Sequence, residues 1–264
     1  MTERYAVIGN PVAHSQSPAI HARFAQATGQ DIVYERIEAP LDGFERAVDE
    51  FRAAGGRGLN VTLPFKQPAF RYCGEVTERA GAAQAVNTLV FGSQVRGDNT
   101  DGVGLVRDLE GNLGLQLSGK SVLLMGAGGA AQGVVGSLVD RKIARLVIAN
   151  RTFSKAARLA ARFEPALAAR YEDLQGAFDV VINATSAGLA DEPLALPASV
   201  IGEDTLVYDM VYARDTAFLR AARAAGARCS DGLGMLVEQA AESFLIWRGV
   251  RPATRAVLAS LRGH

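Results

Sequence analysis

The first half of the chain alternates between short apolar runs and segments with apolar residues at helical spacing. Strand patterns occupy 5–9, 31–39 and 57–63, and helical patterns occupy 17–29 and 41–56. This β-α-β-α-β order predicts an α/β fold with a mainly parallel sheet.

The helix predicted over 17–29 carries its own end signals. Ser17 suits the N-cap, Pro18 suits the first helical position and Gly29 suits the end. A further helix is predicted over 75–85. The next segment, 85–101, instead has the pattern of two short strands joined by a Gly-Ser turn, which predicts a hairpin that ends in a polar loop.

After a helix that begins near residue 102, the pattern starts afresh. Strands are predicted at 121–126, 144–150, 179–185 and 205–212, with helices at 128–142, 154–164 and 234–250 and a final helix from Pro252. This second βαβ series indicates a second α/β domain, and we place the boundary between 102 and 118.

The composition argues against several classes of protein. The 264 residues carry no net charge and no long basic run, so a nucleic-acid partner is not expected. Cys73 and Cys229 lack CxxC or metal-type spacing, which predicts free thiols and no metal site. The N-terminal apolar run is too short for a signal peptide, and no stretch reaches membrane-spanning length. We therefore expect a soluble, cytoplasmic protein.

A glycine-rich turn follows the strand predicted at 121–126. Gly126, Gly128 and Ala131 have the spacing of a dinucleotide fingerprint, placed between a strand and a helix. Gly126 would make the tight turn, and Gly128 would let the backbone approach a pyrophosphate at the helix N-terminus. Ala131 would allow close packing of helix on strand. The alternative is a glycine-rich turn that serves packing alone.

The end of the next strand bears on the choice of cofactor. An NAD site places an acidic residue there to bind the ribose 2′-hydroxyl, but this chain has the acid-free sequence NRTFSK. Its members are Asn150, Arg151, Thr152, Phe153, Ser154 and Lys155. An arginine fork and hydroxyl groups suit a 2′-phosphate. NADP is therefore predicted, with an ordinary solvated loop as the alternative.

Several motifs stand in order along nearly the whole chain. They are HSQSP (14–18), NVTLPFK (60–66), AVNT (85–88), DNTDG (98–102), GAGGAA (126–131), NRT (150–152), NATSAG (183–188), DMVY (209–212) and DGLGMLVEQA (231–240). In this combination the chain resembles the shikimate dehydrogenase family. The resemblance implies NADPH-dependent, reversible reduction of 3-dehydroshikimate to shikimate, in the chorismate pathway of aromatic amino-acid biosynthesis.

The resemblance also implies two α/β domains with different functions and a cleft between them. Residues 1–102 would bind substrate and carry the catalytic groups, completed by C-terminal helices over 236–264. Residues 103–235 would form a Rossmann-type NADP-binding domain. The expected partner is the small-molecule substrate, bound by a monomer or a homodimer.

A substrate of this kind has one carboxylate and several hydroxyl groups. Ser15 and Ser17 stand at the start of a predicted helix, where hydroxyl and N–H groups would bind a carboxylate without an arginine. Ser17 would alternatively serve only as a helix cap. Thr62 and Asn87 are expected to meet the ring hydroxyls, because hydroxyls and amides both donate and accept hydrogen bonds.

Lys66 is out of place in the strand end NVTLPFK, where Val61, Leu63, Pro64 and Phe65 are apolar and no other residue is charged. A solvated surface lysine is the usual interpretation, but this position favours a site. Reduction of a ketone needs a hydride on carbon and a proton on oxygen, and a positioned side chain delivers the proton. We expect Lys66 and Asp101 to be the catalytic pair and to touch substrate, with Lys66 alone or the pair transferring the proton. Asn60 suits a scaffold role as well as a contact.

The resemblance assigns further residues to the two sites. Tyr212 and Gln239 match substrate-contacting positions, and Met210 and Gly232 match positions near the nicotinamide, while Glu78 matches a cofactor-proximal position more weakly. Ala127, Gly129 and Ala130 complete the cofactor-binding turn. His14 and His21 are not included, since the first is expected to shape its loop and the second to be structural.

Two other functions stay open at this point. A quinate or dual-specificity dehydrogenase of the same family tends to carry a threonine in the serine pair and an acid in the ribose loop. Ser15, Ser17 and the acid-free NRTFSK favour shikimate and NADP instead. A non-catalytic NADP-binding sensor would need neither Lys66 nor Asp101.

Overall fold

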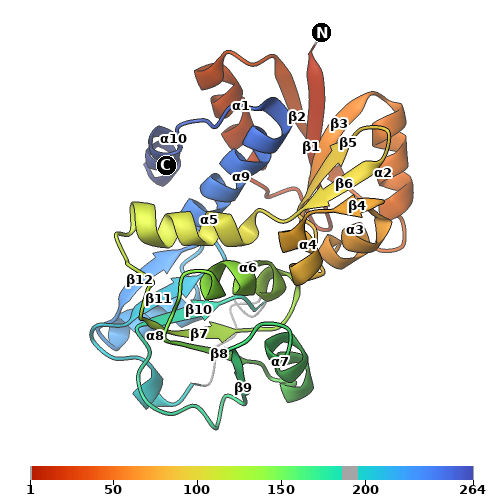
Figure 1. Cartoon of the computed structure of the whole chain (residues 1–264). Helices are drawn as coiled ribbons and strands as arrows, with labels where there is room; N and C mark the ends of the chain where they lie inside the picture. Colours follow the sequence, from red (N-terminus) through yellow and green to blue (C-terminus); the bar gives the residue numbers. More distant parts are fainter. Residues whose placement is uncertain (1, 186–195, 264) are drawn as a thin grey trace. The chain divides into compact units, whose positions relative to one another are not determined.

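The computed structural model describes residues 2–185 and 196–263. By its internal contacts the chain divides into two compact units. Unit 1 comprises Met1–Leu105 and Leu236–His264, and unit 2 comprises Val106–Met235. Each unit contains a six-stranded sheet, labelled in Figure 1. The two-sheet α/β class that the hydrophobic pattern predicted is confirmed.

Unit 1 is built on a mixed sheet. Its elements are β1 (Glu3–Gly9), α1 (Ser17–Thr28), β2 (Ile32–Glu38), α2 (Phe44–Ala53), β3 (Gly56–Val61), α3 (Lys66–Tyr72), β4 (Glu75–Val76), α4 (Glu78–Ala83), β5 (Thr88–Phe91), β6 (Val95–Asp98) and α10 (Arg255–Arg262), with parts of α5 (Asp101–Arg107) and α9 (Leu233–Arg248). The strand order is β2-β1-β3-β5-β6-β4. β1 pairs parallel with β2 and β3, whereas β5 pairs antiparallel with β3 and β6. The ends of β1, β3 and β6 and the start of β5 therefore meet at one edge of the sheet.

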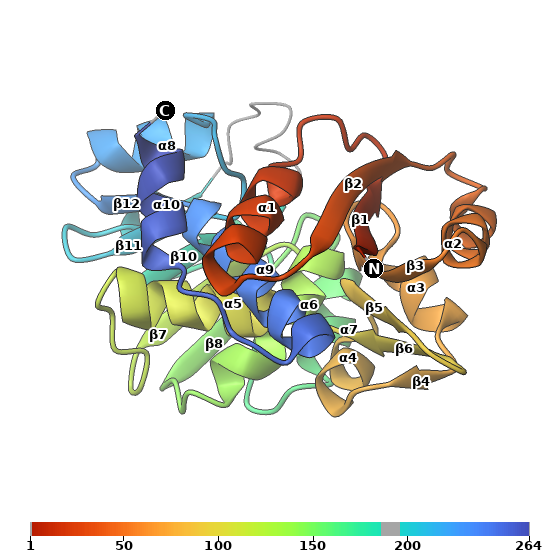
Figure 2. The same cartoon turned by 90° about the horizontal axis from the view of Figure 1, so that it is seen from above.

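Helices cover both faces of this sheet, as Figures 1 and 2 show. α1 and α9 lie on one face, where the rings of Tyr5 and Trp247 stack at 4.7 Å. α2 and α3 lie on the other face and bury Phe44, Phe51 and Phe65 against the strands. A sheet covered on both faces explains why β1 carries the continuous apolar run at residues 5–9.

Unit 2 is an all-parallel doubly wound sheet. Its elements are a π-helical turn (Asp108–Asn112), β7 (Ser121–Met125), α6 (Gly129–Val139), β8 (Arg145–Ala149), α7 (Phe153–Ala160), β9 (Leu167–Ala169), β10 (Val180–Asn183), a 3₁₀ turn (Ala198–Val200), β11 (Leu206–Asp209), α8 (Ala217–Ala224) and β12 (Arg228–Asp231). The order β12-β11-β10-β7-β8-β9 is that of a Rossmann fold, with the order reversing between β7 and β10. Ligands of such sheets bind at the carboxyl ends of the strands, beside that reversal.

Some predicted boundaries are wrong. Glu75–Val76 is not helical but pairs with β6 as a short parallel strand, and the helix begins only after Thr77, whose hydroxyl accepts from the amide of Ala80. The final helix begins at Arg255 rather than Pro252. The pattern also missed the helix α8 and the short strands β9 and β12, and the three or four residues of these strands carry too little periodicity to be read. No helix in the described part of the chain is long and apolar enough to cross a membrane.

Candidate active site and cofactor site

Lys66 and Asp101 form an ion pair at the common edge of the unit 1 sheet. The Nζ of Lys66 donates to Oδ2 of Asp101 over 2.6 Å, and the two side chains are only 14% and 5% exposed. β3 ends at Val61, and a turn closed by the amide of Phe65 on the carbonyl of Thr62 leads directly into α3, whose first residue is Lys66. Asp101 is the first residue of α5. The pair is thus a shielded proton donor and acceptor held by backbone structure on both sides.

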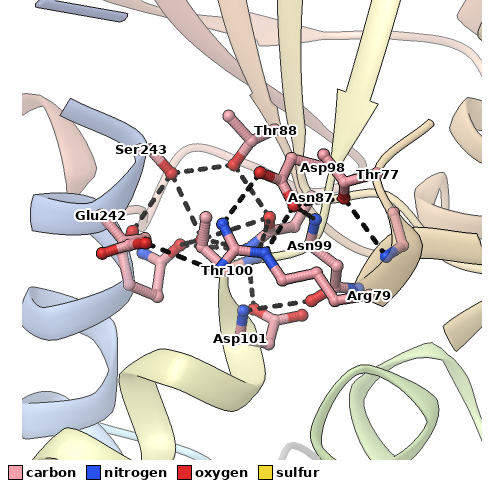
Figure 3. Close-up of polar contacts among 12 residues, drawn as sticks. Thr77, Arg79, Asn87, Thr88, Asp98, Asn99, Thr100, Asp101, Glu242 and Ser243 are labelled. Carbon is pink, nitrogen blue, oxygen red and sulfur yellow. Dashed lines mark hydrogen bonds and ion pairs between the residues drawn. The ribbon is translucent and has the colours of Figure 1, made fainter. Parts of the chain in front are cut away.

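Asn87 is the centre of a hydrogen-bond network around Asp101 (Figure 3). Its Nδ2 donates to Oδ1 of Asp101 over 2.9 Å and to Oε1 of Gln239 over 3.2 Å. Its Oδ1 accepts from the amide of Thr100 over 2.9 Å. Lys66 and Asn87 therefore engage one carboxylate oxygen of Asp101 each, which fixes the plane of that carboxylate.

Two buried hydroxyls of this network were missed by the sequence analysis. Thr100 Oγ1 accepts from Asn87 Nδ2 over 2.9 Å and donates to Gln239 Oε1 over 3.4 Å. Ser243 Oγ lies 3.3 Å from Thr100 Oγ1. A signal was present, because the polar run at 98–101 follows a strand directly and Gln239 and Ser243 stand four apart on one helix face.

Asn60 is fully occupied by the protein. Its Oδ1 accepts from the hydroxyl of Tyr34 over 2.8 Å, and its Nδ2 donates to Ser243 Oγ over 2.9 Å and to the carbonyl of Asn87 over 3.2 Å. Of the two roles considered for Asn60, these contacts favour the scaffold. Thr62, directly after β3, is half-buried and its amide completes the pairing with β1.

Ser15 and Ser17 lie at the start of α1, on the same edge of the sheet. Ser17 is not the N-cap that the sequence predicted. Gln16 takes that position with helical backbone angles, and Ser15 Oγ accepts from the amide of Ser17 over 3.3 Å. Arg36 of β2 donates to the carbonyl of Ser15 over 2.7 Å, which anchors the loop. The end signal at Gly29 is correct, since its φ of +64° is the left-handed cap conformation.

The glycine-rich turn after β7 has the properties that a dinucleotide needs. Gly126 has φ +110°, and a Cβ there would lie 3.0 Å from the carbonyl oxygen of Ala184. Gly128, the N-cap of α6, faces open space, since a Cβ there would meet nothing within 4 Å. Ala131 is fully buried against the sheet. The turn is completed by Ala127, Gly129 and Ala130. Bare backbone and free N–H groups at a helix start fit a pyrophosphate.

The loop after β8 presents its cations to solvent. The segment from Arg151 to Lys155 is exposed, and the Nδ2 of Asn150 donates to the carbonyl of Thr152 over 3.0 Å. Phe153 and Ser154 begin α7. A cation that the sequence analysis did not include lies beside this loop, since the guanidinium of Arg170 is 5.2 Å from the ring centre of Phe153. β9 pairs with β8 in parallel, so Arg170 follows its strand at the same edge as Asn150.

Buried polar groups close the ends of β10 and β11 in unit 2. Asp209 accepts from Thr216 Oγ1 over 2.7 Å, from the amide of Val211 over 3.0 Å and from Asn183 Nδ2 over 3.2 Å. Burial raises the pKa of Asp209 despite these hydrogen bonds. This network orients the chain that leads on to Met210 and Tyr212. Of the predicted motif NATSAG, residues 186–188 lie outside the described residues.

The remaining predicted residues take varied places. Met210 and Tyr212 are half-buried after β11. Gly232 lies so close to the backbone of Met210 that an added Cβ would clash with the Met210 carbonyl oxygen. Glu78 is exposed at the start of α4. His21, expected to be structural, is completely buried with its ring stacked on Tyr34.

The structure therefore brings Lys66, Asp101, Asn87 and Gln239 into one hydrogen-bonded group, whereas Ser15 and Ser17 are held by their own loop. Within residues 2–185 and 196–263, no group of three or more His, Cys, Asp or Glu side chains is placed to hold a metal ion.

Comparison with known proteins places both units in one family. The family model described as the shikimate dehydrogenase substrate binding domain matches residues 7–89. The shikimate/quinate 5-dehydrogenase model matches residues 109–193, and the shikimate 5′-dehydrogenase C-terminal domain matches residues 232–262.

Individual relatives agree with these matches. The chain is 57% identical to the shikimate dehydrogenase (NADP+) of Herminiimonas arsenicoxydans, across 100% of this chain and 98% of the relative. An Ael1 enzyme from Pseudomonas putida shares 48% identity and a TM-score of 0.93, covering 98% of each chain. The Thermus thermophilus shikimate 5-dehydrogenase, solved with NADP(H) and shikimate, shares 34% identity and a TM-score of 0.89, covering 99% of each chain. The chain belongs to the shikimate dehydrogenase (NADP+) family.

Proposed function

We propose that this protein catalyses the reversible, NADPH-dependent reduction of 3-dehydroshikimate to shikimate in chorismate biosynthesis. The observation that carries the proposal is the shielded ion pair of Lys66 and Asp101, held in register by Asn87. Membership of the shikimate dehydrogenase family supports the same substrate and cofactor.

NADPH supplies a hydride to the carbonyl carbon when it is bound. Lys66 donates the proton that the carbonyl oxygen needs, and Asp101 orients the ammonium. The 2.6 Å contact between them keeps Nζ in a fixed position rather than free to rotate among solvent-exposed rotamers. General acid catalysis of this kind is worth about 100- to 10,000-fold in rate.

The substrate is recognised by neutral polar groups around this pair. Asn87 Nδ2 donates to Asp101 and to Oε1 of Gln239, and Gln239 Nε2 donates to the carbonyl of Leu236. Both amides can exchange these bonds for bonds to ring hydroxyls. Thr62 is assigned to a ring hydroxyl and Tyr212 to a further substrate contact. The hydroxyls of Ser15 and Ser17 are assigned to the substrate carboxylate.

The cofactor is assigned to the turn at 126–131 and the loop at 150–155. Bare backbone at Gly128 and the start of α6 would hold the pyrophosphate. Arg151 and Lys155, with no acid beside them, would hold the adenosine 2′-phosphate. Met210 and Gly232 are assigned to the nicotinamide end, and Glu78 to a more distant cofactor contact.

A four-way assay tests this function. Rates are measured with shikimate and with quinate, each with NADP+ and with NAD+. The proposal expects the highest kcat/KM for shikimate with NADP+. Faster turnover of quinate with NAD+ would assign the protein to quinate oxidation instead. Tight NADPH binding with no turnover of either substrate would indicate an NADP-binding sensor.

We also propose that the protein works in the cytoplasm, where NADPH is available. Cys73 and Cys229 are both free thiols, as the reducing conditions of that compartment favour.

A further inference from the structure

Asp98 is a buried carboxylate that lies three residues before Asp101. Arg79 of α4 grips it with two parallel bonds, from Nε to Oδ1 over 2.6 Å and from Nη2 to Oδ2 over 2.8 Å (Figure 3). The hydroxyl of Thr77 donates to Oδ1 over 2.7 Å, and so does the amide of Asn99. The Asp98 side chain is only 7% exposed. This is a fully satisfied, bidentate ion pair outside the group that contains Lys66.

Asp98 fixes the backbone of residues 99–101, which positions Asp101. The Asp98 carboxylate is bonded to the backbone of Asn99, and Oδ1 of Asn99 in turn accepts from the amide of Asp101 over 3.1 Å. The Nδ2 of Asn99 is tied to the carbonyl of Ala85 over 2.9 Å. Asp98 therefore holds Asn99, and Asn99 in turn holds Asp101, in a series that starts from the ion pair with Arg79.

The third guanidinium nitrogen of Arg79, Nη1, does not bind Asp98 but points toward α9. It donates to Oε1 of Glu242 on α9 over 3.4 Å. The other oxygen of Glu242 accepts from Arg251 over 3.2 Å, and Arg251 also pairs with Glu238 over 2.6 Å. The same helix carries Gln239, whose side chain meets Asn87. One guanidinium thus touches both the loop of Asp101 and the helix of Gln239.

We propose that Arg79 is a positioning residue for the dehydrogenase reaction. Through Asp98 it sets the position of Asp101, and hence of Lys66. Through Glu242 it sets the helix that presents Gln239. This inference rests on the proposed function for its kinetic consequences, but its structural content is independent of which substrate is turned over.

The chemistry of the site requires an arginine for this role. A planar guanidinium can bond a carboxylate along one edge while a nitrogen on its other edge bonds a second acceptor. A lysine ammonium is a point charge and cannot reproduce the two-point grip on Asp98. Although burial alone would raise the pKa of Asp98, the bonds from Arg79 and Thr77 hold it below its usual value. The pair therefore stays charged in the folded protein at neutral pH.

The test compares Arg79→Met and Arg79→Lys with the control Arg248→Met in the full-length protein. Arg248 lies in the same unit, donates from Nε to Gln30 over 2.8 Å and pairs with Glu3, with a side chain 19% exposed against 34% for Arg79. It is therefore an arginine of similar burial whose partners are remote in sequence from the loop at 98–101.

Arg79→Met should lower kcat for shikimate oxidation by about 10- to 100-fold, the loss expected when a reacting group is displaced by about 1 Å. KM for shikimate should rise, and the Kd of NADPH should not change. Arg79→Lys should fall between wild type and Arg79→Met. Arg248→Met should keep wild-type kcat even where it lowers the melting temperature. Unchanged kcat in Arg79→Met, or an equal loss in Arg248→Met, would overturn the proposal.

Hydrogen exchange tests the proposal if Arg79→Met does not fold or if the wild-type protein does not oxidise shikimate. If Arg79→Met does not fold, Arg79→Lys and Asp98→Asn take its place. Hydrogen exchange of the amides at 99–101 should be faster in these variants than in wild type, and unchanged exchange would overturn the proposal. This readout needs no activity. Failure of wild type to oxidise shikimate would therefore overturn the proposed function while leaving the role of Arg79 decided by exchange.

Discussion

The ammonium of Lys66 lies 2.6 Å from the carboxylate of Asp101, although the two residues are 35 positions apart in the sequence. The sheet of unit 1 explains this contact. β3 and β6 both pair antiparallel with β5, so they run in the same direction and end at the same edge. Lys66 follows β3, Asp101 follows β6, and Asn87 directly precedes β5. Three separate segments thus deliver their polar residues to one place.

Replacement of Lys66 by alanine should abolish most turnover. Loss of a general acid is expected to reduce kcat by about 100- to 10,000-fold, while the Kd of NADPH stays near the wild-type value. Steady-state kinetics and nucleotide fluorescence measure the two quantities. Lys120→Ala is the matched control, because Lys120 also pairs with an aspartate, Asp179, over 2.9 Å, but in unit 2. Near-normal turnover in Lys66→Ala would remove Lys66 from the mechanism.

Arg151→Ala should weaken NADPH binding by about 10- to 100-fold, since a hydrogen bond to a charged group is worth about 1.5–3 kcal/mol. NADH lacks the 2′-phosphate, so its binding should hardly change. Arg145→Ala is the control. Arg145 opens β8 at the opposite edge of the sheet and stands over the ring of Phe178 at 4.8 Å. Equal losses for NADPH and NADH in Arg151→Ala would rule out recognition of the 2′-phosphate at this residue.

Gly128→Ala should separate folding from cofactor binding. The added methyl group meets nothing within 4 Å in the protein, and the backbone φ of −85° suits alanine, so the melting temperature should be unchanged. The methyl group would occupy the space assigned to the pyrophosphate. A steric cost of about 1–3 kcal/mol should weaken the binding of NADPH and NADH alike by about 5- to 150-fold. Gly111→Ala, also open and in unit 2, should change neither quantity. Wild-type affinities in Gly128→Ala would place the pyrophosphate elsewhere.

His21 should make the protein less stable in acid. Burial lowers the pKa of His21 to about 3 in the folded protein, whereas a histidine in an unfolded chain has a pKa of about 6.5. Below about pH 6.5 the unfolded chain binds a proton that the folded protein does not. The free energy of unfolding should therefore fall by up to about 1.4 kcal/mol for each further pH unit, until about pH 3.

Urea unfolding at pH 7.5, 6 and 5 measures this effect. His21→Phe keeps an aromatic ring beside Tyr34 and removes the titrating group, so its stability should depend less on pH than that of wild type. The exposed His14 serves as the control, and His14→Gln should retain the wild-type dependence. Parallel curves for wild type and His21→Phe would contradict the assignment.

The periodicity of apolar residues was sufficient to predict the fold class, because each strand and helix of adequate length buries a face set by its own local sequence. Short elements such as β9 and β12 escaped, since three or four residues do not define a period. The tight turn at Gly126 was also predicted correctly, since its φ of +110° depends on neighbours in sequence. The assignment of this turn and of the loop at Arg151 to the cofactor stays a prediction.

The chain alone thus determined the two-sheet α/β fold and the anomalous position of Lys66, and it predicts an NADP-type loop at 150–155. Only the tertiary structure decided what Asn60 does, because its partner Ser243 is 183 residues away in the sequence. The same holds for Arg79, whose guanidinium joins Asp98 to Glu242. A buried polar side chain takes its role from the groups that satisfy its hydrogen bonds, and folding, not sequence spacing, brings those groups within reach.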